Sequence, residues 1–288
     1  MATTANSQRN IPLRLNAVPK NLSVKHCIIV MSGKGGVGKS TISANLAVAL
    51  SRSGHNVGLF DADLTSPSIP RLLGISGYIG IEDKQLVPIS YSKNLKVLST
   101  GFLVPSSDCS IVWRGGLKMG AIRQFINETK WGSLDFMIVD LPPGTGDEPL
   151  SIAQDLKPDG CLIVTTPQEV ALTSSRKSVD FARKLGVPII GIIENMSGYT
   201  CPECHVHVAV FKAGGGERSA AELGAPFICR IPLEAAICES GDKGAPIVDI
   251  LAEGSGSAQC LDTIVKSVEA FYDSGPTAAA TADSSPKA

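Results

Sequence analysis

The stretch MSGKGGVGKST, residues 31–41, decides the fold class. It contains the pattern G-x-x-x-x-G-K-[ST], which Gly33, Gly38, Lys39 and Ser40 satisfy. An apolar run precedes the pattern and a segment typical of a helix follows it. Glycines let backbone N–H groups turn toward phosphate oxygens, and the N-terminus of the next helix adds a favourable dipole. The stretch therefore predicts a phosphate-binding loop between a strand and a helix.

Apolar runs of strand length alternate with helix-like segments along the rest of the chain. The predicted strands are 25–31, 56–63, 95–100, 134–142, 160–166, 188–195 and 226–232, and the predicted helices are 40–54, 116–130 and 170–186. Nearly continuous apolar strands separated by helices indicate a mostly parallel sheet covered on both faces. The expected fold class is α/β, of the P-loop NTPase type, in one domain over residues 21–273.

The two ends of the chain differ from this domain in composition. Residues 1–20 are expected to form a flexible arm, and the small, polar residues 274–288 a disordered tail. The N-terminus lacks the apolar core of a signal peptide, and no apolar run is long enough to cross a bilayer. A formal net charge of −1 does not favour a nucleic-acid partner. We expect a cytoplasmic protein with no membrane or nucleic-acid partner.

Polar residues at the ends of the predicted strands complete a nucleotide site. Lys39 is suited to the β- and γ-phosphates and Ser40 to Mg²⁺, with backbone cradling by residues 33–41 (Gly33, Lys34, Gly35, Gly36, Val37, Gly38, Lys39, Ser40, Thr41). Asp140 ends an apolar strand, where a Walker B aspartate holds the water shell of the metal. Asp61 and Asp63, two apart on a predicted strand, would share one face. The alternative is that these aspartates are helix caps or solvated strand ends.

Two of the eight cysteines form the only cluster, CPEC, at Cys201 and Cys204. Two sulfurs cannot saturate a zinc ion or a four-iron cluster, which need about four ligands. Two copies related by a twofold axis would supply four thiolates, so a homodimer could bind one bridging [4Fe-4S] cluster. Three alternatives remain open: a zinc site with His205 or His207, a redox-active pair, and two unliganded thiols.

The loop GKGGVGKS resembles the deviant phosphate loop of the ParA/MinD/Mrp branch of P-loop ATPases, in which the early lysine, here Lys34, is the signature residue. The resemblance implies that Lys34 reaches the phosphates of a partner subunit in a nucleotide-sandwich dimer. Further stretches, in collinear order over residues 20–270, resemble the Mrp (ApbC-like) iron–sulfur carrier ATPases: DADLTSPSIPRLLG, DFMIVDLPPGTGDEPLSIAQ, TTPQEVAL, ENMSGYTCPEC, FKAGGGE and IPLEAAICESGDKGAPIV.

This resemblance implies roles for particular residues. Asp63 positions or activates the hydrolytic water and, with Lys34 and Lys39, makes up the catalytic set. Asp61 and Asp140 support Mg²⁺, Asn195 reads the adenine edge, and Pro232 lines the base pocket. The implied activity is slow ATP hydrolysis. His205 departs from the family pattern, because glycine commonly follows the second cysteine there.

The implied function is a homodimeric carrier that binds Mg²⁺-ATP, holds a labile [4Fe-4S] cluster at Cys201 and Cys204, and transfers it to apoproteins. A MinD/ParA-type positional switch is one alternative, although the chain ends in a tail of no net charge rather than a basic amphipathic helix. A nucleotide-dependent zinc or nickel metallochaperone is another.

Overall fold

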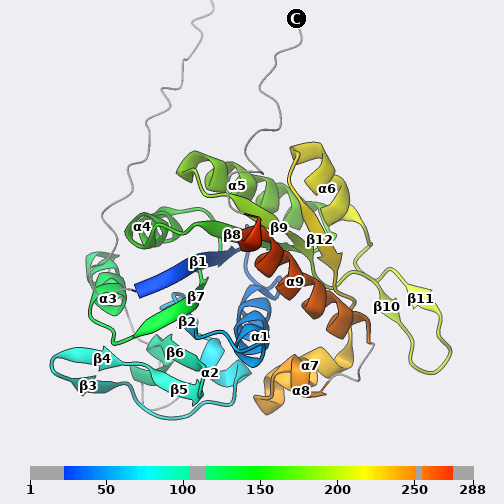
Figure 1. Cartoon of the computed structure of the whole chain (residues 1–288). Helices are drawn as coiled ribbons and strands as arrows, with labels where there is room; N and C mark the ends of the chain where they lie inside the picture. The colour runs from blue at the N-terminus through cyan, green and yellow to red at the C-terminus, as the bar shows by residue number, and fades with distance from the viewer. Residues whose placement is uncertain (1–22, 104–114, 251–254, 275–288) are drawn as a thin grey trace, which may run out of the picture.

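The computed structural model describes residues 23–103, 115–250 and 255–274. Its centre is an eight-stranded sheet with the order β12-β9-β8-β1-β7-β2-β6-β5 (Figure 1). Only β5 runs antiparallel to its neighbour, so the prediction of a mostly parallel sheet is confirmed. The strands are β1 (Ser23–Met31), β2 (Val57–Asp61), β5 (Ile89–Ser92), β6 (Leu95–Ser99), β7 (Ser133–Asp140), β8 (Gly160–Thr165), β9 (Ile189–Glu194) and β12 (Phe227–Arg230).

Helices cover both faces of this sheet, because its central strands are apolar on both sides and must be buried on both. One hydrophobic core contains Phe60, Trp131 and Met137 and packs beneath α3 to α6. The other contains Leu46 and Ile264 and packs beneath α1, α2, α7 and α9. The helices are α1 (Lys39–Arg52), α2 (Ile69–Leu72), α3 (Gly115–Asn127), α4 (Asp147–Leu156), α5 (Glu169–Leu185), α6 (Gly215–Leu223), α7 (Ala235–Lys243), α8 (Ile247–Ile250) and α9 (Gly256–Asp273), with a 3₁₀ turn η1 (Thr100–Leu103).

Two small antiparallel hairpins lie outside the central sheet. The first pairs β3 (Gly80–Glu82) with β4 (Gln85–Val87), and the second pairs β10 (Tyr199–Thr200) with β11 (His207–Val208). They project from opposite sides of the molecule in Figure 1. Neither was predicted, because strands of two or three residues carry too little alternation to be recognised. The second hairpin contains both residues of the cysteine cluster and is called the cysteine hairpin (residues 199–208) below.

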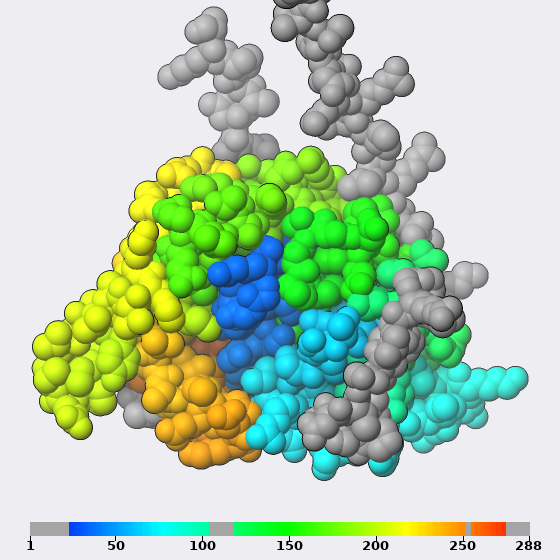
Figure 2. Space-filling model, turned by 180° about the vertical axis from the view of Figure 1, so that it is seen from behind, coloured from blue at the N-terminus to red at the C-terminus, as the bar shows by residue number. Residues whose placement is uncertain are grey.

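The register of the sheet brings the predicted site residues to one edge. Asp61 at the end of β2 lies opposite Asp140 at the end of β7, and Asp140 lies opposite Val30 near the end of β1. The loop that follows β1 therefore leaves the sheet beside both carboxylates. In Figure 2, the blue surface of the first described part of the chain lies in the middle of one face, and the yellow-green lobe at the edge carries the cysteine hairpin.

The predicted arm, residues 1–20, lies outside the described residues, as does the predicted tail apart from Ser274. None of the helices that the structure describes is both long and apolar enough to cross a membrane.

Candidate functional site

The phosphate-loop residues connect β1 to α1, as the motif predicts. Gly36 and Gly38 adopt left-handed backbone conformations, with φ of 77° and 88°. A Cβ atom on Gly38 would lie 2.1 Å from Nδ2 of Asn195, so a side chain at this position would collide with a neighbour as well as strain the backbone. The helix begins at Lys39, directly after this glycine.

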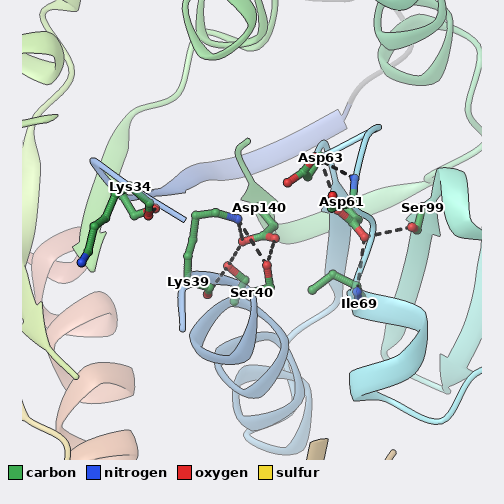
Figure 3. A network of polar contacts seen from close by, with 11 residues as sticks. Lys34, Lys39, Ser40, Asp61, Asp63, Ile69, Ser99 and Asp140 are labelled. Atoms are coloured by element: carbon green, nitrogen blue, oxygen red, sulfur yellow. Dashed lines mark hydrogen bonds and ion pairs between the residues drawn. The ribbon is translucent and has the colours of Figure 1, made fainter. Parts of the chain in front are cut away.

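Lys39, Ser40 and Asp140 lie together at the start of α1 (Figure 3). The Nζ atom of Lys39 is 2.7 Å from Oδ1 of Asp140, and the hydroxyl of Ser40 donates to Oδ2 at 2.6 Å. A second hydroxyl, from Ser43, donates to Oδ1 at 2.7 Å. Asp140 is fully buried, and one ammonium group and two hydroxyl groups contact its carboxylate. Sequence reasoning missed Ser43, although it stands one helical turn after Ser40, where side chains share a face.

This arrangement has the chemistry that Mg²⁺-nucleotide binding needs. Hydroxyl and carboxylate oxygens are the protein ligands that Mg²⁺ prefers, often through water. A lysine at a helix N-terminus suits phosphate. Ser40 as a Mg²⁺ ligand, Asp140 as a ligand through water and Lys39 as the phosphate lysine stay predictions of role.

The expectation that Asp61 and Asp63 share one face of a strand is wrong, because β2 ends at Asp61. Oδ2 of Asp61 accepts hydrogen bonds from the hydroxyl of Ser99 at 2.9 Å and the backbone N–H of Ile69 at 3.3 Å. Complete burial, followed by repulsion from Asp140, raises the pKa of Asp61 to about 7. Asp61 thus ties the end of β2 to the start of α2, and its support of Mg²⁺ stays a prediction.

Asp63 lies in the loop after β2 and is partly exposed. Its carboxylate accepts from the backbone N–H groups of Thr65 at 3.2 Å and Ser66 at 3.1 Å. It lines a cavity of about 530 Å³ together with residues 142, 143 and 146–149. These residues follow Asp140 directly, so Asp63 borders solvent beside the predicted metal site. That place is compatible with handling a water molecule, which stays a prediction.

Lys34 points away from Asp140 and its neighbours in Figure 3. Its Nζ atom lies 3.4 Å from Oε1 of Gln168, at the residue before α5. Val170, two residues after Gln168, is 71% exposed. Sequence reasoning did not find Gln168, since its contact with Lys34 spans 134 residues of chain. The half-buried lysine is therefore held by a residue of its own chain.

Asn195 and Pro232 follow the ends of the neighbouring strands β9 and β12, where Glu194 lies opposite Arg230. Nδ2 of Asn195 donates to the backbone carbonyl of Val37 in the phosphate loop at 2.9 Å. Pro232 is half-buried. The two residues thus stand at the same edge of the sheet as the loop, and their contact with adenine stays a prediction.

The cysteine hairpin presents both thiols at the surface, with Cys201 partly exposed and Cys204 exposed. The backbone N–H of Cys201 donates to Val206 at 3.1 Å, which closes the turn. Hydrogen bonds to the Cys201 sulfur from the backbone of Cys204 and of Glu203, and then from the Cys204 thiol, hold the pKa of Cys201 below its usual value. A lowered pKa favours the thiolate, which is the form that binds metal.

The two histidines beside the cysteines do not complete a metal site. Nδ1 of His207 lies 3.3 Å from the hydroxyl of Thr200, across the hairpin. His205 sits in the turn with φ of 57°. In the part of the chain that the structure describes, no group of three or more His, Cys, Asp or Glu side chains is arranged to hold a metal ion. A zinc site of Cys201, Cys204 and a histidine is thus not preformed among the described residues of this chain.

Comparison with known families agrees with this geometry. A family model described as a NUBPL iron-transfer P-loop NTPase, of the ParA group, matches residues 23–269. This chain belongs to that family. The match spans the phosphate loop, both aspartate strands and the cysteine hairpin, and it confirms the resemblance found in the sequence.

Two relatives of this NTPase family cover most of the chain. The iron–sulfur cluster carrier protein of Methanocaldococcus jannaschii is 45% identical over 261 residues, which are 88% of each chain. The cytosolic Fe-S cluster assembly factor NUBP2 of Homo sapiens is 44% identical over 248 residues, which are 84% of this chain and 90% of the human protein.

Solved structures show the same fold. A nucleotide-binding protein from Archaeoglobus fulgidus, in complex with ADP, superposes with a TM-score of 0.69 at 38% identity and covers 78% of this chain and 88% of its own. The cell division ATPase MinD of Pyrococcus furiosus gives a TM-score of 0.63 at 23% identity, over 86% of this chain and 99% of its own. The second likeness concerns the fold alone, and both confirm the predicted P-loop NTPase class.

Proposed function

We propose that this chain is an iron–sulfur cluster carrier that binds Mg²⁺-ATP, hydrolyses it slowly, and holds a labile [4Fe-4S] cluster between two copies of itself. The cargo would pass from Cys201 and Cys204 to apoproteins that need a cluster. The names of the archaeal and human relatives support the cargo. The human name also supports a cytoplasmic place of action, and nothing in the proposal needs a membrane or nucleic acid.

The observation that carries the proposal is the cysteine hairpin itself. It offers two accessible thiols, one with a lowered pKa, and no third ligand among the described residues of its own chain. A [4Fe-4S] cluster takes four thiolates, which two copies around a twofold axis supply. A cluster held in this way by two projecting hairpins has few protein contacts, which suits a cargo that must leave.

Apolar side chains around the cysteines support an assembly of two copies. Seven large hydrophobic side chains are exposed among the described residues, and three of them, Val206, Val208 and Val210, lie in or next to the cysteine hairpin. Exposed apolar patches mark contact surfaces more often than free surface. A second copy that covers these valines would also bring its own Cys201 and Cys204 to the same place.

The position of Lys34 supports the proposal of slow hydrolysis. The lysine is held by Gln168 and does not reach the Lys39–Asp140 group of its own subunit. A catalytic cation that must come from a partner makes hydrolysis depend on dimer formation, as an arginine finger does in trans. A single subunit is thus expected to bind ATP and turn it over poorly.

Anaerobic reconstitution with ferrous iron and sulfide tests the cargo. We expect a broad visible chromophore and about four iron atoms per dimer. The double variant Cys201→Ala/Cys204→Ala should lose both. The matched control is Cys238→Ala, which removes an exposed cysteine from α7, away from the hairpin. A chromophore that survives in the double variant would refute the assignment of ligands, and zinc or nickel without a chromophore would favour a metallochaperone.

A further inference from the structure

Glu194 is a buried carboxylate that the nucleotide site does not use. It is the last residue of β9 and is fully buried. Its Oε1 atom accepts from the hydroxyl of Ser197 and from the backbone N–H of Gly214, the latter at 2.8 Å. Its Oε2 atom accepts from the backbone N–H of Gly216. Within the described residues no lysine, arginine or histidine forms an ion pair with it.

These three donors come from both ends of one excursion of the chain. Ser197 lies on the outgoing side, two residues before the cysteine hairpin begins, and Gly214 and Gly216 lie on the returning side, at the start of α6. The side chain of Glu194 therefore closes the base of the excursion that holds Cys201 and Cys204. In Figure 1 the hairpin extends from the region where β9, β12 and α6 meet.

The close approach of Glu194 explains why glycine is required in the GGGE stretch, residues 214–217. A Cβ atom on Gly216 would come within 2.9 Å of Oε2 of Glu194. Only a glycine lets the carboxylate approach the N–H groups at the start of α6 so closely. The N-terminal end of a helix favours a negative charge, and buried backbone donors hold a carboxylate in one orientation. The base of the hairpin is thus fixed by hydrogen bonds to a buried carboxyl group.

Glu194 is also linked to the nucleotide site, through the residue that follows it in the chain. The next residue, Asn195, donates from Nδ2 to the carbonyl of Val37 in the phosphate loop at 2.9 Å. The same amide nitrogen occupies the space beside Gly38, 2.1 Å from where a Cβ would stand. A change in the phosphate loop on nucleotide binding must displace Asn195 or be resisted by it. Asn195 and Glu194 share a peptide bond, so the displacement reaches the hairpin base without any further contact.

We propose that Glu194 is a positioning residue that transmits the nucleotide state of the phosphate loop to the cysteine pair. The route runs from Val37 to Asn195, from Asn195 to Glu194, and from the carboxylate to both ends of the hairpin excursion. This proposal rests on the proposed function, because it takes the two cysteines as the site that holds the cluster. The coupling itself concerns the thiols and can be measured without a cluster.

The reactivity of the thiols reports this coupling. The sulfur of Cys201 is held by backbone N–H groups of the turn, so its reactivity depends on the shape of the hairpin. We would measure the rates at which N-ethylmaleimide modifies Cys201 and Cys204, resolved by peptide mass spectrometry, with and without a non-hydrolysable ATP analogue and Mg²⁺. In the unchanged protein the analogue should alter these rates by about fivefold or more, the lower range of allosteric couplings.

Glu194→Gln is the decisive variant. It keeps the shape of the side chain but turns one of the two oxygens into an N–H donor, so the side chain can accept from Gly214 or from Gly216 but no longer from both. We expect the analogue to bind still, and its effect on thiol modification to fall below about twofold. Glu217→Gln is the matched control, because Glu217 lies in the first turn of the same helix, is exposed and pairs with Arg230. This control should respond to the analogue like the unchanged protein.

Two further measurements separate the possible outcomes. Ser197→Ala removes one donor without placing a new group in the core, so it should reduce the response partly even if Glu194→Gln fails to fold. A full response in Ser197→Ala or in a folded Glu194→Gln would overturn the proposal, as would no response in the unchanged protein with the analogue bound. Failure of the unchanged protein to take up iron and sulfide would instead refute the carrier function, with the thiol result still standing.

Discussion

His205 adopts a left-handed backbone conformation in the turn after the two cysteines, with φ of 57°. That conformation costs a residue with a Cβ atom roughly 1–2 kcal/mol and costs glycine almost nothing. A glycine at this position would therefore relieve backbone strain that His205 carries. Its imidazole is close in sequence to both thiols and could serve as a zinc ligand. Whether His205 binds metal therefore distinguishes a zinc site from a cluster site.

The variant His205→Gly tests that distinction. We expect iron content and the visible chromophore after reconstitution to match those of the unchanged protein. The free energy of unfolding should change by no more than about 1 kcal/mol, because relief of backbone strain is offset by the greater freedom of glycine in the unfolded chain. Metal analysis and thermal unfolding measure the two quantities. A variant that loses bound zinc and takes up no cluster would instead identify His205 as a zinc ligand.

Asp61 makes a second prediction at the scale of one residue, through its raised pKa of about 7. A carboxyl group whose pKa is higher in the folded than in the unfolded state stabilises the fold while it is protonated. That stabilisation is complete below pH about 4 and is lost as pH rises to about 7. Asp61→Asn mimics the protonated form and keeps an acceptor for Ser99 and Ile69.

We therefore expect Asp61→Asn to gain stability relative to the unchanged protein between pH 4.5 and 8, by roughly a few kcal/mol at the upper end. Unfolding would be followed in the absence of nucleotide and with a chelator present, so that no Mg²⁺ compensates the charge. A difference in stability that stays constant over this pH range would show that Asp61 is ionised throughout, and that Ser99 and the N-terminus of α2 stabilise its charge.

Among the elements, the phosphate loop has both a steric and a conformational requirement for glycine at Gly38. Gly38→Ala places a methyl group against the amide of Asn195 and holds a non-glycine residue at φ of 88°. We expect a loss of stability of about 1–2 kcal/mol from the backbone alone, a further loss from the displaced Asn195, and no measurable ATP binding. Thermal unfolding and a fluorescent ATP analogue would measure these effects.

Gly35→Ala is the control for stability at this loop. Nothing lies within 4 Å of a Cβ on Gly35, and its φ is outside the left-handed range. This variant should unfold within about 0.5 kcal/mol of the unchanged protein. Equal losses of stability in both variants would mean that neither the left-handed conformation nor the contact with Asn195 is decisive.

Some helices and strands could be predicted from the sequence and others could not. The difference is whether an element depends on a local sequence pattern or on contacts with distant segments of the chain. The long apolar strands such as β1 and β8 were predicted within about two residues, because burial on both faces leaves a continuous signal. The hairpins β3–β4 and β10–β11 and the edge strand β5 were missed. They are short and half-exposed, and their pairing depends on neighbours that local patterns do not reveal.

The candidate site shows the same division. Lys39, Ser40 and Asp140 could be found because a fixed motif and the end of an apolar strand place them at one edge of a parallel sheet. The partners Gln168 and Glu194 could not, since their contacts join segments that only the folded chain brings together. The prediction that Asp63 lies on the strand failed for a different reason. The strand was extended two residues too far, which assigned a loop side chain to the face of a sheet.

For the whole molecule, the decisive question is whether Lys34 acts at its own nucleotide site or at that of the second copy in the proposed dimer. The side chain is held by Gln168 on the outside of its own nucleotide site, while Lys39 is buried against Asp140 within that site. The side chains of these two lysines, five residues apart, therefore point in different directions, and their removal should impair different steps. Lys39→Ala should abolish ATP binding. Lys34→Ala should keep the affinity for ATP within a few-fold and lower kcat by about 10³ or more, as removal of a trans-acting cation does.

Mixing the two variants distinguishes action within a subunit from action between subunits. Each variant alone should be nearly inactive. In an equal mixture, half of the dimers contain one of each, and each mixed dimer has one intact phosphate loop that faces an intact Lys34. The mixture should therefore recover about a quarter of the unchanged activity, because one site in two works in half of the dimers. Co-purification of the untagged variant with an affinity-tagged copy of the other, in the presence of ATP, would confirm that mixed dimers form. Mixed dimers without recovered hydrolysis would place Lys34 in its own subunit's site, and the dependence of turnover on a second copy would then have to come from another residue.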